Sequence, residues 1–306
     1  MLADDASRMR RMVAILTGFL LAAGVAACGG GSGAGSHAST TAPPSPPLST
    51  ESAPSRSSAP GSPKIVVVFM ENQNYANIEG NSCCPYETGL AGRGLLLSNF
   101  YGVTYPSRPN YLAFAGGSTF GQSGNDNPLP LISADNLFQQ LSDAGVSWWA
   151  WAEDYPGSYG SCSRTPTAPN YAMRHVAPLL FAGVANTSLC DNVSADEPQT
   201  LPSFLWVTPD MCNDDHDCDP ATGDRWLAAH VPAWLGQGAE VFITYDTGNP
   251  DHTHGGGHVY AVLAGQGIAH RVDGTLMNDY SALAGIERAF HLPLLGSAAG
   301  APPVPF

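Results

Sequence analysis

The stretch KIVVVFM at Lys64–Met70 is followed directly by Glu71 and Asn72. Its apolar residues do not alternate with polar ones, which is typical of a strand buried on both faces of a parallel sheet. Similar runs occur at Val146–Ala152, Ser203–Thr208, Glu240–Tyr245 and His258–Ala264, and helical patterns occur at Ala134–Ala144 and Tyr280–Phe290. We therefore predict an α/β fold with a mostly parallel central sheet covered by helices on both faces.

Polar side chains follow four of these strands, at the point where each strand ends. They are Glu71 with Asn72, Glu153 with Asp154, the stretch Asp210–Cys218, and Asp246. Ligands of open α/β sheets bind outside the carboxyl ends of the strands, so we expect these groups to meet at one edge. Any one of the acids is also explained as a turn or helix-capping residue. Together, carboxylates near an imidazole suit a divalent cation that assists phosphoryl chemistry.

The stretch YPSRPN at Tyr105–Asn110 places Ser107 between two prolines. Proline restricts its own backbone and the residue before it, so we predict that the Ser107 hydroxyl is held in a rigid turn. A serine hydroxyl acts as a nucleophile only with a base or a metal ion beside it. Taken alone, the stretch is more typical of an ordinary turn. Arg108 is either a bidentate phosphate ligand or a solvated turn residue.

The composition favours a globular enzyme. The chain has 306 residues, of which 43% are hydrophobic and 12% charged, and this apolar content is too high for a disordered protein. Its formal net charge is -14 at pH 7. An acidic balance excludes binding to nucleic acid through bulk charge, because phosphate backbones attract a basic surface. We therefore expect no nucleic acid among its partners.

The N-terminal part of the chain is predicted to lie outside the folded domain. Residues 1–28 resemble an export signal, in which three arginines precede an apolar run that is short for a membrane span. Its end, Val25–Cys28, is similar to a lipobox and predicts a lipid anchor on Cys28, with ordinary signal cleavage as the alternative. Residues 29–63 are rich in Gly, Ser, Thr and Pro and are predicted to be a disordered tether. Residues 64–306 form the predicted catalytic domain.

The cysteines of this domain are even in number, which favours disulfide bonds in an exported protein. Cys212 and Cys218 are near enough in sequence to close one loop, and Cys162 with Cys190 can close another. Cys83 and Cys84 then pair with each other or outside this scheme, and both alternatives stay open.

Characteristic motifs occur along the chain in the order Phe69–Tyr75, Tyr105–Ala113, Gly117–Gly121, Trp151–Asp154, Tyr171–His175, Pro209–Cys218, Gly223–Leu227 and Tyr280–Leu283. In this order they resemble the phosphoesterase family of bacterial acid phosphatases and phospholipases C. The resemblance covers nearly all of Lys64–Leu295 and is nearest to the compact secreted acid phosphatases. It implies an alkaline-phosphatase-like α/β/α sandwich and hydrolysis through a phosphoserine intermediate.

The resemblance also implies roles for individual residues. Ser107 would be the nucleophile, and Asp214 and His216 would bind phosphate or pass a proton to the leaving group. Substrate would be bound by Asn110, Arg108 and His175. A divalent metal ion would be held by Glu71, Asn72 and Asp246, with His258 as a further ligand.

The chain departs from the family pattern at two positions. Tyr105 stands where the family usually has histidine, and a tyrosine is no near-neutral base. Thr247 stands where the family usually has a second carboxylate after Asp246. The stretch Asn249–His258 is rich in histidine and could supply the metal ligand that is missing at Thr247. Histidine ligands would shift the preference of the site towards zinc or iron. The candidates are Asp251, His252, His254 and His258, although a mobile surface loop is the favoured explanation for His252 and His254.

These observations predict a phosphoric monoester hydrolase, either lipid-anchored at the cell surface or secreted. Its substrates would be phosphorylated small molecules or lipid head groups, and the anchor on Cys28 would bring it to a membrane. A phospholipase C-type phosphodiesterase would share the fold but needs an apolar groove for lipid. A non-catalytic phosphate-binding lipoprotein is the third hypothesis, motivated by Tyr105 and Thr247.

Overall fold

A computed structural model of the chain describes residue 61 and residues 63–125, 130–158 and 160–306. The predicted export signal lies outside these residues, and so does nearly all of the predicted tether. Within the described ranges, no helix is both long enough and apolar enough to cross a membrane.

The described part of the chain forms β-strands, α-helices and 3-10 helices that alternate along the sequence. The strands are β1 (Ile65–Met70), β2 (Leu95–Leu97), β3 (Phe100–Tyr101), β4 (Trp148–Ala152), β5 (Thr167–Ala168), β6 (Tyr171–Ala172), β7 (Val193–Ser194), β8 (Phe204–Thr208), β9 (Glu240–Tyr245), β10 (Ala261–Ala264), β11 (Arg271–Asp273) and β12 (Met277–Asn278). The α-helices are α1 (Tyr75–Ile78), α2 (Pro85–Ala91), α3 (Ser107–Gly116), α4 (Leu137–Asp143), α5 (Ala182–Ala185), α6 (Pro220–Gly236) and α7 (Asp279–Ala289). Four 3-10 helices complete the described elements: η1 (Met173–His175), η2 (Ala177–Leu180), η3 (Ser188–Asn192) and η4 (Gly296–Gly300).

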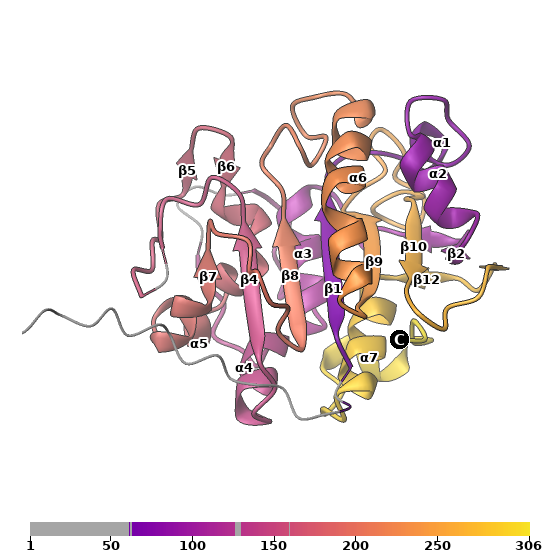
Figure 1. Ribbon diagram of the computed structural model, residues 1–306. Coiled ribbons are helices and arrows are strands. Elements are labelled where there is room, and N and C mark those ends of the chain that lie inside the picture. Colours follow the sequence, from indigo (N-terminus) through magenta and orange to yellow (C-terminus); the bar gives the residue numbers. More distant parts are fainter. Residues whose placement is uncertain (1–60, 62, 126–129, 159) are drawn as a thin grey trace, which may run out of the picture. The chain divides into compact units, whose positions relative to one another are not determined.

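An 8-stranded sheet forms the centre of the domain (Figure 1), in the order β11-β2-β10-β9-β1-β8-β4-β7. β1 pairs in parallel with β8 and β9, and β4 pairs in parallel with β8 and β7. β10 runs antiparallel to both of its neighbours, β9 and β2. The prediction of a mostly parallel central sheet is confirmed.

The middle strand, β1, is buried along its whole length. Its register aligns Ile65 with Phe204 of β8 on one side and with Glu240 of β9 on the other. An unbroken run of Val and Ile suits a strand with both faces covered. The fifth predicted strand begins later than expected, at Ala261, because His258 and Val259 form isolated bridges to Tyr101 and Asn74 instead of continuing β10.

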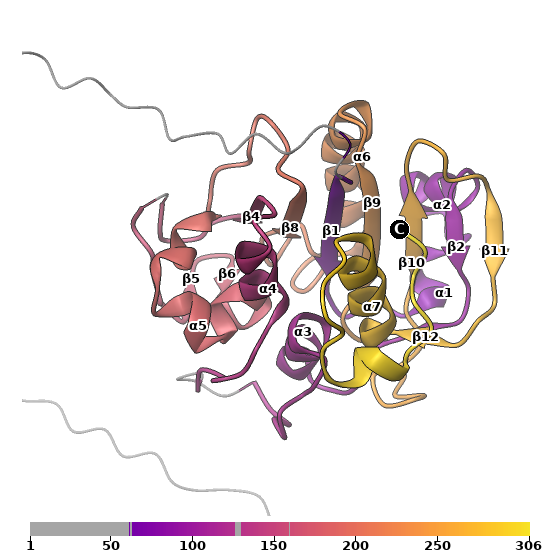
Figure 2. The ribbon, with the colours of Figure 1, turned by 90° about the horizontal axis from the view of Figure 1, so that it is seen from below.

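Helices cover both faces of the sheet (Figures 1 and 2). α6 packs with α2 over one face, and α3 packs with α4 and α7 over the other. Beneath α3, Phe69 of β1 contacts Phe114 and Trp206 with ring centroids 5.4 and 5.7 Å apart. The molecule is therefore the three-layered α/β/α sandwich that was predicted.

Two elements differ from the sequence-based expectations. Ser107 begins the helix α3 instead of lying in a turn, because Pro106 is the N-cap and Pro109 lies in the first turn, where a missing N–H breaks no helical hydrogen bond. The 17-residue helix α6 has no counterpart among the predicted helices. Trp226 and Trp234, eight residues apart, lie on its buried side, which is the helical spacing that indicates such an element.

Three cysteine pairs lie within the described domain. Cys212 is bonded to Cys218 and Cys162 to Cys190, so both predicted pairs are confirmed. Cys83 is bonded to its neighbour Cys84, the first of the two alternatives left open.

Candidate active site

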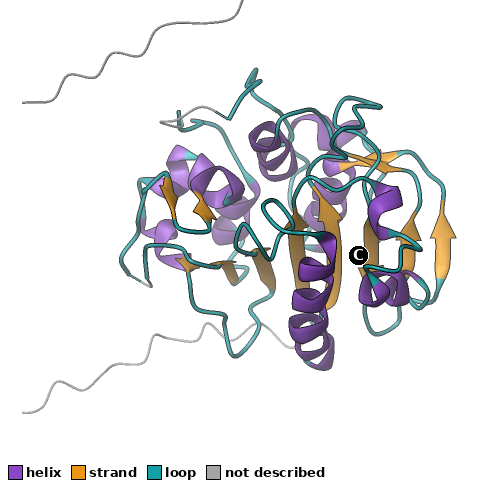
Figure 3. Cartoon of the chain, turned by 90° about the horizontal axis from the view of Figure 1, so that it is seen from above, coloured by secondary structure: helices purple, strands orange, loops and turns teal. Residues whose placement is uncertain are grey.

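The carboxyl ends of β1, β4, β8 and β9 lie at one edge of the sheet, which Figure 3 views from above. Since these strands are parallel, the residues that follow them come together there. The Glu71 N–H donates to the Asp214 carbonyl at 2.8 Å, and the Asp246 N–H donates to the Met70 carbonyl at 2.9 Å. The segments that follow β1, β8 and β9 are thus joined into one site.

Ser107 lies at this edge as the first residue of α3. Its hydroxyl donates to Glu71 Oε2 at 2.9 Å, and its side chain is 3% exposed. The positive end of the helix dipole lies at this position and favours a negatively charged group. Tyr105, which is 47% exposed, lies two residues earlier beside His252, with ring centroids 4.9 Å apart. The exposed Tyr105 ring, where the family usually has histidine, therefore packs against the imidazole of His252.

Glu71 is the fully buried centre of the site. Besides Ser107, it accepts hydrogen bonds from the Tyr111 hydroxyl at 2.6 Å and from Asn72 Nδ2 at 3.3 Å. Burial raises the pKa of Glu71 well above its usual value, and the charges of Asp246 and Asp214 raise it further, while the Tyr111 and Ser107 hydrogen bonds lower it. Several acids thus share a volume from which water is excluded.

Asp246 and Asn72 form a second part of the site. Asp246 Oδ1 accepts the N–H groups of Asn72 at 2.9 Å and of Thr247 at 2.6 Å. The Thr247 hydroxyl donates to Asn72 Oδ1 at 3.0 Å. Asn72 has a φ of 58°, a left-handed conformation that asparagine adopts more readily than most residues. Thr247 therefore orients the Asn72 amide, where the family usually supplies a second carboxylate.

Asp214 and His216 lie in the loop Asp210–Cys218, which the Cys212–Cys218 disulfide closes. Asp214 Oδ1 accepts the His216 N–H at 2.8 Å, and Asp214 Oδ2 lies 3.7 Å from His175 Nδ1. The other ring nitrogen of His175, Nε2, lies 3.3 Å from Glu71 Oε1. Burial, and then the nearby Arg174 and His216, lower the pKa of His175 well below its usual value, so this imidazole is neutral.

The residues present fit a divalent metal ion. Glu71, His175 and His216 offer ligand atoms that all lie within 4.8 Å of one another. Three atoms, Asp246 Oδ2, Asp214 Oδ2 and His175 Nε2, are buried without a hydrogen-bond partner among the described residues. Buried acids without partners are costly, and a bound cation removes that cost. Mixed imidazole and carboxylate ligands suit first-row divalent metals.

The candidate ligand set overlaps only partly with the predicted one. Glu71 belongs to both sets, and Asn72 and Asp246 lie beside it through the hydrogen bonds described above. His175 and His216, predicted to bind substrate and to transfer a proton, join Glu71 in the cluster.

Two of the predicted substrate-binding residues, Arg108 and Asn110, form hydrogen bonds with other residues of the protein. Arg108 is fully buried, and its guanidinium donates to Gln122 Oε1 at 3.0 Å and to the Pro130 carbonyl at 2.6 Å. Asn110 accepts the Thr104 N–H at 2.9 Å and donates to the Thr104 carbonyl at 2.8 Å. These contacts anchor the segment after α3 and fix the turn that leads into it.

The predicted metal ligand His258 has different neighbours from the Glu71 cluster. Its Nε2 lies 3.0 Å from the Ser98 carbonyl, and its ring stacks on Tyr75 and Tyr101 with centroids 4.4 and 5.0 Å away. Its N–H donates to Asp251 Oδ2 at 2.8 Å. His258 and Asp251 thus hold the start of the last predicted strand against neighbouring loops.

Two residues that the sequence analysis does not single out lie in the site. Tyr111 donates to Glu71 and lies one helical turn after Ser107, a spacing that places both side chains on one face of α3. Arg174 Nη2 lies 3.4 Å from His216 Nε2. Both residues belong to motifs quoted above, Tyr111 to that of Ser107 and Arg174 to that of His175. Their closeness in sequence to these predicted site residues is the signal that could have identified them.

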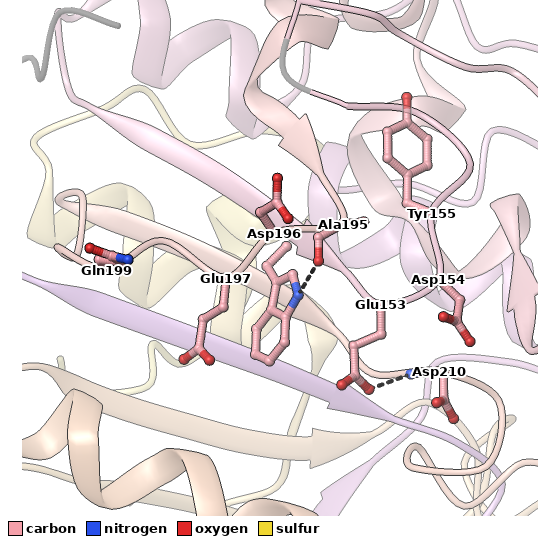
Figure 4. Close-up of a pocket in the computed structure, with 9 residues that line it drawn as sticks. Glu153, Asp154, Tyr155, Ala195, Asp196, Glu197, Gln199 and Asp210 are labelled. Carbon is pink, nitrogen blue, oxygen red and sulfur yellow. Dashed lines mark hydrogen bonds between the residues drawn. The ribbon is translucent and has the colours of Figure 1, made fainter. Parts of the chain in front are cut away.

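An acidic pocket of about 740 Å³ lies where β4 and β7 end (Figure 4). Its lining includes Glu153, Asp154, Tyr155, Asp196, Glu197 and Asp210. Glu153 Oε2 accepts the Asp210 N–H at 3.0 Å and Asn213 Nδ2 at 2.9 Å. Glu153, one of the acids predicted at this edge, therefore anchors the beginning of the loop that carries Asp214 and His216.

Comparisons with known proteins show the family to which the chain belongs. The model of the Phosphoesterase family matches residues 81–293. A phosphatidylinositol-3-phosphatase of Mycobacterium tuberculosis is 32% identical over 249 residues, which are 78% of this chain and 81% of that protein. An acid phosphatase of Aspergillus fumigatus is 29% identical over 252 residues, 75% of this chain but only 55% of that longer protein.

Among solved structures, one from a study of glycosaminoglycan metabolism by Bacteroides thetaiotaomicron superposes with a TM-score of 0.54. The two chains are 11% identical, and the match covers 76% of this chain and 78% of the other. This likeness concerns the fold alone.

The fold is an α/β/α sandwich with a mostly parallel central sheet, and the relatives define a hydrolase of phosphate esters. The chain belongs to the phosphoesterase family. The predicted enzyme class, a phosphoric monoester hydrolase, is confirmed by this membership and by the relatives.

Proposed function

We propose that this protein hydrolyses phosphate monoesters through a phosphoserine intermediate on Ser107, assisted by a divalent metal ion. The observation that carries the proposal is the hydrogen bond of 2.9 Å from the Ser107 hydroxyl to the buried Glu71, at the edge where Asp214, His216 and Asp246 meet. A serine whose hydroxyl proton is held by a carboxylate in a buried site has the arrangement that a nucleophile needs.

Each residue of the site has a distinct task in this proposal. Ser107 Oγ attacks the phosphorus, the new Oγ–P bond forms, and the bond from phosphorus to the leaving oxygen breaks. Glu71 Oε2 holds the Ser107 proton, and the Tyr111 and Asn72 hydrogen bonds keep the Glu71 carboxyl in place. His216 gives a proton to the leaving oxygen as the general acid. Water then attacks the phosphorus and gives a proton to His216, the Oγ–P bond breaks to release phosphate, and Glu71 returns the proton to Ser107 Oγ.

A metal ion would be held by Glu71 and Asp246 with the Asn72 amide, and by His175. When bound, it supplies positive charge that stabilises the transferring phosphoryl group and the deprotonated serine.

Substrate class and location complete the proposal. Phosphorylated small molecules and phosphorylated lipid head groups are the proposed substrates, supported by relatives named as an acid phosphatase and a phosphatidylinositol-3-phosphatase. Residues 1–28 are proposed as an export signal ending at a lipid anchor, residues 29–63 as a tether and residues 64–306 as the phosphoesterase domain.

The test measures hydrolysis of para-nitrophenyl phosphate, of its bis-ester and of phosphatidylcholine by the full chain, with and without a chelator. Ser107→Ala is expected to abolish monoester turnover, because the nucleophile is removed. Ser123→Ala, at an exposed serine outside the site, is the matched control and should keep the wild-type rate. Chelation should suppress activity, and added divalent metal should restore it.

Three other results would contradict this proposal. Turnover of diesters alone would identify a phospholipase C-type phosphodiesterase. Phosphate binding by folded protein without turnover of any ester would identify a binding protein. Monoester turnover that persists in Ser107→Ala would exclude the phosphoserine.

A further inference from the structure

The guanidinium of Arg174 lies beside the proposed nucleophilic site and has no assigned role. We propose that Arg174 binds the phosphoryl oxygens of the substrate and of the product phosphate. This inference rests on the proposed function, since it assigns a further binding residue to that site. It also places the phosphate-binding arginine at a different position from Arg108, for which the family resemblance implied substrate binding.

The first support is the geometry of Arg174. Its Nη2 lies 3.4 Å from His216 Nε2, longer than an optimal hydrogen bond. Its Nε is buried and has no hydrogen-bond partner among the described residues. Guanidinium groups carry five donors in a planar fork that matches phosphate oxygens. Arg174 therefore has donor capacity next to the site that its contacts within the chain do not use.

The second support is the protonation pattern that this contact requires. A guanidinium has no acceptor atom, so His216 Nε2 must accept, and the ring proton must lie on Nδ1. His216 Nδ1 lies 2.7 Å from Asp217 Oδ1, which accepts that proton. Movement of Arg174 from His216 to a phosphate would free the Nε2 lone pair. The guanidinium can thus exchange this contact for a phosphate oxygen.

The third support is electrostatic. Glu71, Asp214 and Asp246 are all buried at this edge, and their charges would repel a phosphate dianion. The guanidinium of Arg108 donates to Gln122 and to the Pro130 carbonyl instead of facing this edge with free donors assigned to phosphate. Arg174 adds a permanent positive charge in contact with the cluster, independent of any metal ion.

The experiment measures binding of inorganic phosphate to the full chain by titration calorimetry, together with KM and kcat for para-nitrophenyl phosphate. Arg174→Gln is expected to weaken phosphate binding and to raise KM by about 10- to 100-fold, the range for loss of a charge-assisted contact. The effect on kcat should be smaller, because the contact is made to bound substrate as well as in the transition state.

Two further variants make the result specific. Arg174→Lys should recover part of the phosphate affinity, because it keeps the charge but loses the planar fork. Arg164→Gln removes an exposed arginine that donates to Asn186, and it should bind phosphate as the wild type does. Melting temperatures of all variants identify any loss of folding, and Arg174→Lys decides the question if Arg174→Gln does not fold.

Unchanged phosphate affinity in a folded Arg174 variant would overturn the inference, even in an enzyme that hydrolyses monoesters. A fall in kcat alone, with phosphate binding intact, would overturn it as well. Conversely, phosphate binding that depends on Arg174 in a protein without turnover would uphold the inference and reject the proposed function. The two proposals therefore fail in distinguishable ways.

Discussion

Single buried carboxyl groups govern how this protein responds to pH, and Glu287 on α7 is the clearest case outside the site. Its side chain is fully buried, and Oε1 accepts the Leu295 N–H at 3.0 Å. Burial raises the pKa of Glu287 to about 8 from an ordinary value of 4.5. In this range the folded protein keeps a proton that the unfolded chain loses. The stability contributed by this group is therefore present at acid pH and falls as the pH rises.

We predict that Glu287→Gln flattens the dependence of unfolding free energy on pH. One retained proton gives a slope of up to about 1.4 kcal/mol per pH unit, and glutamine removes it while keeping an acceptor for the Leu295 N–H. Denaturant unfolding between about pH 5 and pH 8 measures the slope. Asp143→Asn, at an exposed acid that ends α4, is the control and should keep the wild-type slope. Identical slopes in wild type and Glu287→Gln would contradict the prediction.

At the scale of elements, the loop between β8 and α6 decides the geometry of the site. It carries Asp214 and His216, is anchored at Asp210 by Glu153 and is closed by the Cys212–Cys218 disulfide. Such a short crosslink stabilises the fold by about 2 kcal/mol in the chain-entropy model. Its second effect is to limit the positions that the Asp214 and His216 side chains can take.

We predict that Cys212→Ala with Cys218→Ala lowers kcat/KM by more than about tenfold, because misplacement of catalytic groups by an ångström has an effect of this size or larger. The matched control removes the Cys162–Cys190 disulfide, whose cysteines are 28 residues apart. That change should lower stability by about 3.6 kcal/mol and leave kcat/KM within about twofold. Equal losses of activity in both double variants would show that the disulfides act through stability alone.

At the scale of the whole molecule, the charge of the chain limits how it reaches a membrane. A net charge of -14 gives no attraction to anionic lipid surfaces. Residence at a membrane, if substrates are lipid head groups, then depends on the proposed anchor at Cys28 and on the tether that follows it.

We predict that Cys28→Ser shifts phosphatase activity from the membrane fraction to the soluble fraction, with kcat and KM unchanged for a soluble monoester. The anchor lies outside the domain that contains the site, so its loss should alter location only. Metabolic labelling with palmitate measures lipidation, and fractionation of cells and medium measures where the protein and its activity lie. Wild-type protein found unlabelled in the medium would instead support ordinary signal cleavage.

Much of the fold was predictable because its signals are local. β1, β8 and β9 are unbroken apolar runs, and their burial follows from composition alone. α3 was missed because the prolines around Ser107 indicate a turn as well as the start of a helix. α6 was missed because Pro232 interrupts a pattern that its tryptophans otherwise mark.

The candidate site was predictable only in part. Their positions directly after predicted parallel strands implied that Glu71, Asp214 and Asp246 would meet, and the structure brings their segments together. The hydrogen-bond partners of Arg108 and His258 could not be predicted from the neighbouring sequence. Gln122 and Ser98 reach these side chains from other parts of the chain.

By itself, the sequence determined the α/β class, five of the eight strands of the central sheet, two of the disulfide pairs and the family, because each depends on residues that are close in sequence or on motifs in a fixed order. Only the tertiary structure decided which polar groups touch. Ser107 meets Glu71 across 36 residues, and Asn72 meets Asp246 across 174. Contacts at such separations depend on how the strands and helices pack, and that packing places Arg174, rather than Arg108, against His216.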